Sequence, residues 1–139
     1  MKKRTPIAAI MTKKVITLQT GDSLNKAEYL FKKHHIRHIP VLKGEKVVGM
    51  LSYTDLLRIS FADAVDEDDD SVETIVYNMF TLEQVMAKKL VSVNSETSIR
   101  EVAELLSKKE FHAIPVMDNE ELVGMVTTTD LLNYMLEEF

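Results

Sequence analysis

The chain has 139 residues, 45% of them apolar, enough for one compact domain or for two small halves that share a core. Its formal net charge of −5 argues against a general nucleic-acid binder, and the lack of cysteine excludes disulfides, thiolate zinc sites and cysteine nucleophiles. No apolar run approaches the roughly 20 residues of a membrane helix, and the stretch after the basic start is too short for a signal peptide. We therefore expect a cytoplasmic protein without nucleic-acid or membrane partners.

In chain order, Thr5-Pro6 predicts a short helix with proline at its first position. Residues 15–18 are a short β-type run, and Ser23 begins a helix that ends near residues 33–35. The apolar face of this helix is Leu24, Ala27, Leu30 and Phe31. Residues 38–42 and 46–51 are predicted strands around a turn at residues 43–45, and a helix follows from Thr54.

The middle of the chain carries an acidic run at residues 66–70, which predicts a solvated linker. Four apolar residues after it predict a helix that docks elsewhere: Ile75, Val76, Met79 and Phe80. Thr81 and Gln84 have the spacing of a capping box, which predicts a short helix before Met86.

The C-terminal part repeats the order of the first. Residues 90–93 are a β-type run, and Ser98 with Glu101 predicts a capped helix that ends near residues 108–110. Its apolar face is Ile99, Val102, Ala103 and Leu106. Strands at 113–117 and 121–126 flank a turn at 118–120, and the last helix begins near Thr129. The predicted apolar face of that helix is Leu131, Leu132, Met135 and Leu136.

These similarities are an internal repeat, because the segment from Met11 to Leu57 recurs at one constant offset of 75 residues. Ile39-Pro40-Val41 returns as Ile114-Pro115-Val116 (115 − 40 = 75), and Thr54-Asp55-Leu56-Leu57 returns as Thr129-Asp130-Leu131-Leu132. The prediction is an α+β, two-layer fold of two β-α-β-β-α repeats with pseudo-two-fold symmetry. We assign residues 1–60 to the first repeat with its N-terminal helix, 61–80 to the linker and docking helix, and 81–139 to the second repeat.

Each repeat contains a motif that begins with glycine, where a strand gives way to a helix. The first is Gly49…Ser52…Asp55 and the second is Gly124…Thr127…Asp130. Free N–H groups and the positive helix terminus favour an anion there, the hydroxyl can donate to a phosphate, and the carboxylate can accept from ribose hydroxyls. The same spacing also fits a capping box that only starts a helix. Spacing alone favours the cap, and repetition of the whole motif weakens that interpretation.

The two copies resemble cystathionine-β-synthase (CBS) domains, and the pair resembles a Bateman module, through the apolar-Pro-Val strands and the two glycine-led motifs. The resemblance implies ribose binding by Asp55 and Asp130, in clefts between the copies. It implies phosphate contacts from Ser52, Thr127, Thr54, Thr129, Arg37, His38 and His112. It implies adenine contacts from Ile16, Thr17, Ile39 and Pro40, with His38 beside them, and from Val91, Ser92, Ala113, Ile114 and Pro115. Arg37-His38 stands where the second copy has His112-Ala113, so we expect unequal affinities.

We therefore expect a stand-alone, non-catalytic regulatory module that binds AMP, ADP or ATP, with or without Mg²⁺, and needs no catalytic cofactor. As a homodimer it would signal its ligand state to an effector protein. One alternative is a ligand-independent dimerisation or interaction module, and another is a sensor of S-adenosylmethionine, NAD or a cyclic dinucleotide. An enzyme is a further class, but no nucleophile–base pair is apparent, and phosphoryl transfer would need a metal clamp.

Two groups of side chains have alternative interpretations. His34 and His38 have helical spacing suited to a metal, but we expect the helix to end between them, and the second copy has Lys109 and Ala113 there. A metal site at the acidic run is disfavoured because nothing fixes its geometry. Lysine pairs at 13–14 and 88–89 recur at the same offset and lie either near phosphates or in solvated turns.

Overall fold

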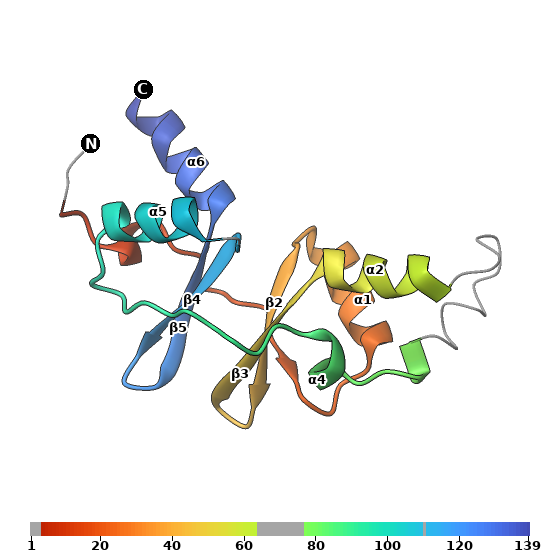
Figure 1. Cartoon of the computed structure of the whole chain (residues 1–139). Helices are drawn as coiled ribbons and strands as arrows, with labels where there is room; N and C mark the ends of the chain where they lie inside the picture. Colours follow the sequence, from red (N-terminus) through yellow and green to blue (C-terminus); the bar gives the residue numbers. More distant parts are fainter. Residues whose placement is uncertain (1–3, 64–76, 110) are drawn as a thin grey trace. The chain divides into compact units, whose positions relative to one another are not determined.

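The computed structural model describes residues 4–63, 77–109 and 111–139, and the predicted acidic linker with Ile75 and Val76 lies outside them. The chain divides into two compact units (Figure 1). The first-repeat unit is Ile16–Leu90, and the second-repeat unit is Met1–Val15 with Val91–Phe139. Each unit mixes helices with a small sheet, which confirms the predicted α+β class.

The first-repeat unit is built around a three-stranded sheet. Its elements are β1 (Leu18–Gln19), α1 (Leu24–His34), β2 (His38–Lys43), β3 (Lys46–Ser52), α2 (Tyr53–Asp63) and α4 (Leu82–Val85). The strand order is β1-β2-β3, with β1 parallel and β3 antiparallel to β2. Ser23 caps α1 because its hydroxyl accepts the Lys26 N–H at 3.1 Å. The predicted helix and hairpin are confirmed.

The second-repeat unit has the same hairpin and flanking helices. Its elements are the 3₁₀ turn η1 (Ile7–Ala9), α5 (Ile99–Lys108), β4 (Ala113–Asp118), β5 (Glu121–Thr127) and α6 (Thr128–Glu138). The Ser98 hydroxyl accepts the Glu101 N–H at 3.1 Å and caps α5. Both hairpins shift register after the valine of the apolar-Pro-Val stretch, at Val41 and at Val116, so the repeat extends to this irregularity.

The strand that opens each repeat is shorter than predicted. β1 covers only two residues, and its ladder with β2 begins at the Leu18↔Val41 pair. In the second repeat the equivalent contact is the single bridge Val93↔Val116. The predicted strands at 15–18 and 90–93 are therefore wrong in extent, since β propensity does not decide how many residues find a partner.

Pro6 also differs from its prediction. It is the N-cap of η1 in an extended conformation, not the first helical residue, and it bridges to Ser98. The next N–H, that of Ile7, donates to the Thr97 carbonyl at 2.7 Å. Pairing with the start of α5 therefore holds Pro6 extended, and the helix is reduced to one 3₁₀ turn.

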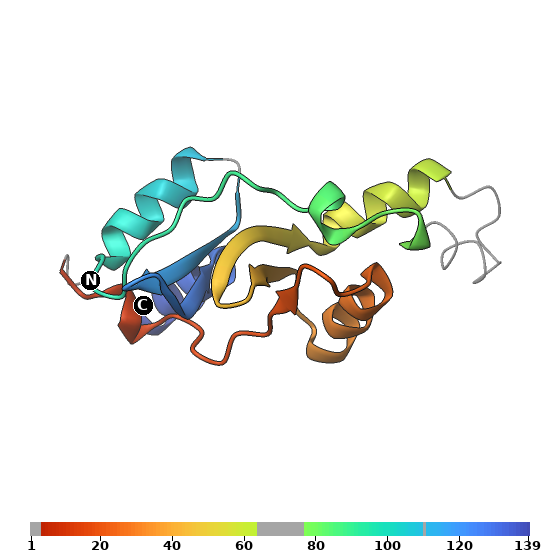
Figure 2. The same cartoon turned by 90° about the horizontal axis from the view of Figure 1, so that it is seen from below.

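The segment at the start of each repeat pairs with the motif strand of the other repeat, and we call these two the exchanged segments. Thr12 stands at the start of the first repeat, yet its N–H donates to the Met125 carbonyl on β5 at 2.8 Å. Ala87 stands at the start of the second repeat, yet its N–H donates to the Met50 carbonyl on β3 at 2.9 Å. Figures 1 and 2 both show the N-terminal turn beside elements of the second repeat. The predicted boundaries at residues 60 and 80 follow the sequence repeat and stay a prediction.

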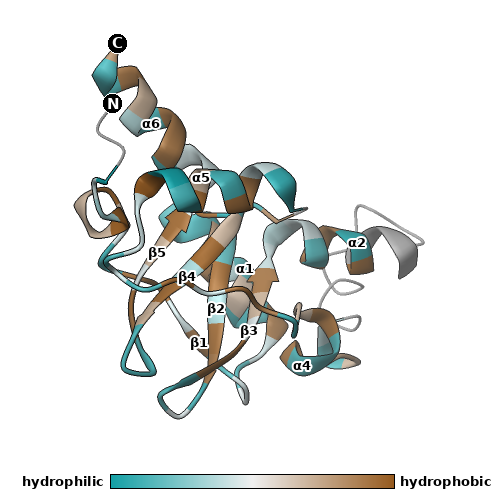
Figure 3. Ribbon diagram, turned by 60° about the vertical axis from the view of Figure 1, so that its left-hand side comes forward, coloured by the Kyte–Doolittle hydropathy of each residue, from teal (hydrophilic) through white to brown (hydrophobic). Residues whose placement is uncertain are grey.

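Each unit has its own apolar core, and the hairpin strands that feed it are largely hydrophobic in Figure 3. The first core holds Leu18, Leu24, Ala27, Phe31, Ile39, Val41, Leu51, Leu56, Tyr77, Leu82 and Met86. The second holds Ile7, Ile99, Val102, Ile114, Val116 and Val126. Of the predicted docking residues, Phe80 packs against the first core and Met79 is exposed. The exchanged segments therefore contribute buried side chains, Leu82 to one core and Ile7 to the other.

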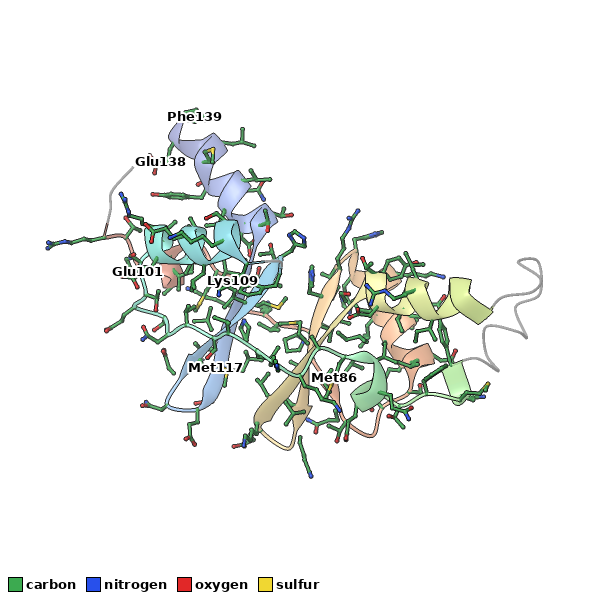
Figure 4. The ribbon with its side chains drawn as sticks, in the orientation of Figure 1. Met86, Glu101, Lys109, Met117, Glu138 and Phe139 are labelled. Atoms are coloured by element: carbon green, nitrogen blue, oxygen red, sulfur yellow. The ribbon has the colours of Figure 1, made fainter. Side chains whose placement is uncertain are left out.

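The apolar face predicted for the last helix is only partly buried. Leu131 and Tyr134 pack against the second core, whereas Leu132, Met135 and Leu136 are 52%, 38% and 69% exposed. Phe139 follows the helix at its C-terminal tip (Figure 4) and is also exposed. The predicted apolar face therefore turns only in part toward the core, because helical spacing does not reveal which surface covers an apolar stripe.

None of the helices in the described ranges has the length and apolar character required to cross a lipid bilayer.

Candidate functional site

The first motif lies at one end of the β2–β3 hairpin. Ser52 is the last residue of β3 and pairs with His38, the first residue of β2. The next residue, Tyr53, begins α2 and donates its N–H to the Arg37 carbonyl at 2.9 Å. Arg37, His38, Ser52 and Asp55 are thus brought together at one strand-to-helix turn.

The second motif has equivalent geometry. Thr127 ends β5 and pairs with Ala113, and the Thr128 N–H donates to the His112 carbonyl at 3.0 Å. His112, Ala113, Thr127 and Asp130 therefore gather at the start of α6. Thr54 and Thr129 are exposed in the first turns of their helices, next to the motif carboxylates.

Hydroxyl and carboxylate form a reciprocal cap in both motifs. The Ser52 N–H donates to Asp55 Oδ2 at 3.0 Å, and the Asp55 N–H donates to Ser52 Oγ at 3.1 Å. The Thr127 and Asp130 distances are 2.9 and 3.2 Å. The helix-capping interpretation is thus correct as local structure. It does not exclude a ligand, because each hydroxyl keeps its own hydrogen for donation and each carboxylate keeps acceptor capacity on Oδ1.

The residues assigned to adenine fall into two groups. Ile39, Ile114, Pro40, Pro115 and Ala113 are buried, so the isoleucines could meet a base only through their main chain. Ile16 packs against the first core, Thr17 is half-buried, and Val91 and Ser92 are exposed. Both pairs precede the first contact with the apolar-Pro-Val strand, at Leu18↔Val41 and at Val93↔Val116. Thr17 and Ser92 are thereby placed next to that strand.

The leading glycines have a steric explanation. A Cβ on Gly49 would collide with the Met86 sulfur, and a Cβ on Gly124 would lie 2.6 Å from the Met11 sulfur. Met86 is labelled in Figure 4, where the chain leaves α4, and Met11 follows η1. The exchanged segments therefore pack directly against the motif strands at the two glycines. The recurrence of Met11 as Met86 was the sequence signal for this contact.

Two further residues approach the carboxylates, and neither was assigned from the sequence. The Arg58 Nη1 lies 3.5 Å from Asp55 Oδ1, and the Thr12 Oγ1 lies 3.5 Å from Asp130 Oδ2. Arg58 could have been found from its i+3 position on the predicted helix. Thr12 gives no such signal, because it stands at the start of the first repeat and contacts the second.

The lysine pairs follow the exchanged segments. Lys13-Lys14 come directly after Thr12, which pairs with β5, and Lys88-Lys89 come directly after Ala87, which pairs with β3. Each lysine pair thus begins next to a residue that is paired with the motif strand of the other repeat.

The histidines near the first motif do not share a helix. α1 ends at His34, His35 is left-handed with φ 53°, and His38 begins β2. Within the described residues, no group of three histidine, aspartate or glutamate side chains is arranged to hold a metal ion.

Two residues outside the motifs have shifted pKa values. Hydrogen bonds from the Ser95 hydroxyl at 2.6 Å and from the Ser95 N–H at 3.0 Å lower the pKa of Asp118. Burial, and then the charge of Glu138, raise the pKa of Tyr134 on α6. The first shift reflects a loop fastened to the end of β4, and we assign neither residue to the candidate site.

A family model for the CBS domain matches the chain twice, at residues 7–62 and 82–137. The chain belongs to the CBS domain family. The CBS domain-containing protein YhcV of Bacillus subtilis is 28% identical over 129 residues, which are 92% of this chain and 84% of YhcV. The chain spans only 25% of a similar homoserine O-acetyltransferase from Methanohalobium evestigatum and 33% of the protein MJ1404 of Methanocaldococcus jannaschii.

Solved CBS pairs share the fold of this chain. The CBS domain pair of protein MJ0100, in complex with 5′-methylthioadenosine and S-adenosyl-L-methionine, superposes with a TM-score of 0.81 at 24% identity. The match covers 97% of this chain and 98% of that one. CBSX2 in complex with AMP superposes with a TM-score of 0.77 at 20% identity, over 96% of this chain and 98% of CBSX2. These two solved pairs thus hold different adenosine ligands.

Proposed function

We propose that this CBS pair is a non-catalytic regulatory module that binds an adenine nucleotide of the AMP, ADP or ATP type, with or without Mg²⁺, at its two motifs. In this proposal Asp55 and Asp130 accept from ribose hydroxyls, and Ser52 and Thr127 donate to a phosphate. Ligand state would be signalled to an effector protein. The cytoplasmic location stays a prediction.

The observation that carries the proposal is the double use of the motif side chains. Capping fixes each carboxylate and hydroxyl at the start of an 11-residue helix through Asp Oδ2 and the hydroxyl oxygen, so Asp Oδ1 and the hydroxyl hydrogen take no part in the cap. Two such positions occur in one chain, beside Arg37-His38 and His112-Ala113. A preorganised site loses little conformational freedom on binding. The adenosine ligands of the MJ0100 and CBSX2 pairs support the ligand class.

The test is a thermal-shift panel with AMP, ADP, ATP, NAD, S-adenosylmethionine and cyclic di-AMP. A ligand at about 100 times its dissociation constant adds about 2.7 kcal/mol to the free energy of unfolding. We expect this gain with at least one of them, and its loss in the double variant Asp55→Asn, Asp130→Asn. The asparagine oxygen can still accept the capping N–H, so the helix starts are kept.

A capping variant away from the motifs is the matched control. Gln84→Ala removes half of the Thr81–Gln84 capping box and should leave the ligand-induced shift unchanged. If no ligand shifts the wild type, a ligand-independent interaction module takes the place of the nucleotide sensor.

A homodimer through α6 is the second part of the proposal. Leu132, Met135, Leu136 and Phe139 form an exposed apolar stripe at i, i+3, i+4 and i+7, and Leu57 is exposed at the equivalent of Leu132. A second copy presents the same stripe, so a symmetric contact can cover both. Sedimentation should give a dimer for the wild type and for Asn133→Glu, and a monomer for Leu136→Glu. A wild-type monomer, or a Leu136→Glu dimer, would exclude this interface.

A further inference from the structure

The two motif carboxylates have different polar neighbours. Asp55 Oδ1 faces the guanidinium of Arg58, whose side chain is 73% exposed, at 3.5 Å. Asp130 has the Thr12 hydroxyl near Oδ2, and within the described part of the chain its carboxylate makes no ion pair. Arg58 corresponds to Asn133 at the offset of 75 residues. The first carboxylate is therefore balanced by a cation and the second is not.

A second charge difference lies at the residue whose carbonyl accepts the first helical N–H after each motif strand. Arg37 is fixed beside the first motif because its carbonyl accepts the Tyr53 N–H, and its side chain is exposed. The equivalent backbone position in the second repeat is His112, whose carbonyl accepts the Thr128 N–H. The first motif thus has arginine at two neighbouring positions, Arg37 and Arg58, where the second motif has His112 and Asn133. Guanidinium stays charged at all working pH values and matches phosphate with paired donors.

We propose that the two sites divide ligands by charge, the Asp55 site taking phosphorylated adenosine compounds and the Asp130 site preferring uncharged ones. This inference rests on the proposed function. At the first site, the contact between Arg58 and Asp55 is long and exposed, so it costs little to break. The Arg58 guanidinium can then bind a phosphate, and Asp55 Oδ1 can accept a hydrogen bond from a ribose hydroxyl. At the second site, Oδ1 needs no such exchange, and His112 and Asn133 stand where the first motif has its arginines.

Single-site variants allow each site to be measured alone. Asp130→Asn keeps only the first site intact, and Asp55→Asn keeps only the second. Calorimetric titration of each variant with AMP and with adenosine gives the ratio of the two affinities at the remaining site. We expect AMP to bind about tenfold or more tightly than adenosine at the first site, as a charge-assisted contact provides, and about equally at the second. Arg58→Asn in the first-site protein should remove most of that preference, and Asn133→Arg in the second-site protein should create one.

Arg100→Asn is the matched control, because Arg100 pairs with Glu104 on α5 and not with a motif carboxylate, and should leave both ratios unchanged. Equal AMP-to-adenosine affinity ratios at the two sites, or a first-site ratio insensitive to Arg58→Asn, would overturn the division of ligands by charge. The proposed function would survive that result. Failure of every adenosine compound tested, including those of the thermal-shift panel, to bind the wild type would instead overturn the proposed function and this inference with it.

Discussion

Gly49 and Gly124 begin the motifs because methionine side chains occupy the space where a Cβ would be. We expect Gly49→Ala to lower the free energy of unfolding by about 1–3 kcal/mol, the usual cost of overpacking a core. Urea denaturation measures the change. Met86 is part of the first core, so it has little room to move aside.

Gly21→Ala is the control for that change, because a Cβ there meets nothing within 4 Å and should be nearly neutral. Combining Gly49→Ala with Met86→Ala should cost less than the sum of the two single changes, since the collision is removed. Strict additivity would show that the methionine is not the reason for the glycine.

Asp118 makes one part of the stability pH-dependent. Because Ser95 lowers the pKa of Asp118, the unfolded chain binds this proton more tightly than the folded chain. The stabilisation is complete above the unfolded pKa of about 3.9 and is lost as the pH falls through the lower folded pKa. The stability advantage of wild type over Ser95→Ala should therefore shrink in acid, as measured by urea unfolding across that range.

Ser107→Ala serves as the matched serine change, because the Ser107 hydroxyl donates to the Glu104 carbonyl and contacts no carboxylate. Its stability difference from wild type should be independent of pH. A constant difference for Ser95→Ala as well would contradict the role of Asp118.

At the scale of single elements, α1 ends in a left-handed residue that is not glycine. His35 has φ 53°, and its N–H closes the helix on the Phe31 carbonyl. A left-handed conformation costs most residues about 1–2 kcal/mol, which glycine avoids. We expect His35→Gly to raise the free energy of unfolding by about 0.5–1 kcal/mol, measured by thermal and urea denaturation.

The neighbouring change His34→Gly is the control, since His34 is helical and glycine there should cost about 0.5–1 kcal/mol. Destabilisation by His35→Gly would mean that the imidazole has a stabilising role beyond the cap.

Local elements were largely predictable because their signals are local. Ser23 and Ser98 marked helix starts, and the turn residues at Gly44 and Asn119 marked the hairpins, all of which the structure contains. The site was predictable as far as each motif places its own hydroxyl and carboxylate. The exposed face of α6 was not, because Leu136 reads as a core residue by spacing whether or not anything covers it.

For the chain as a whole, the sequence did not predict that the exchanged segments pack against the other repeat. Ile7 is fully buried in the second core and Leu82 in the first, although each lies just before the other repeat. Spacing and propensity describe neighbours along the chain, whereas Thr12 and Met125 meet across almost its full length. Only tertiary packing decides which sheet receives each segment.

This exchange predicts that a change in either segment destabilises the hairpin of the other repeat first. Ile7→Ala should cost about 2–5 kcal/mol and should first reduce hydrogen-exchange protection in β4 and β5, although Ile7 precedes the first repeat. Leu82→Ala should act first on β2 and β3. Loss of protection in the sequence-adjacent hairpin, after either change, would contradict the exchange.

A crystal structure of the chain grown with saturating AMP would show whether the two capped motifs are adenosine sites. We expect ribose hydroxyls within about 3.2 Å of the carboxylate of Asp55, Asp130 or both. AMP bound away from both carboxylates, or motifs that hold only their helix caps under saturating AMP, would contradict it.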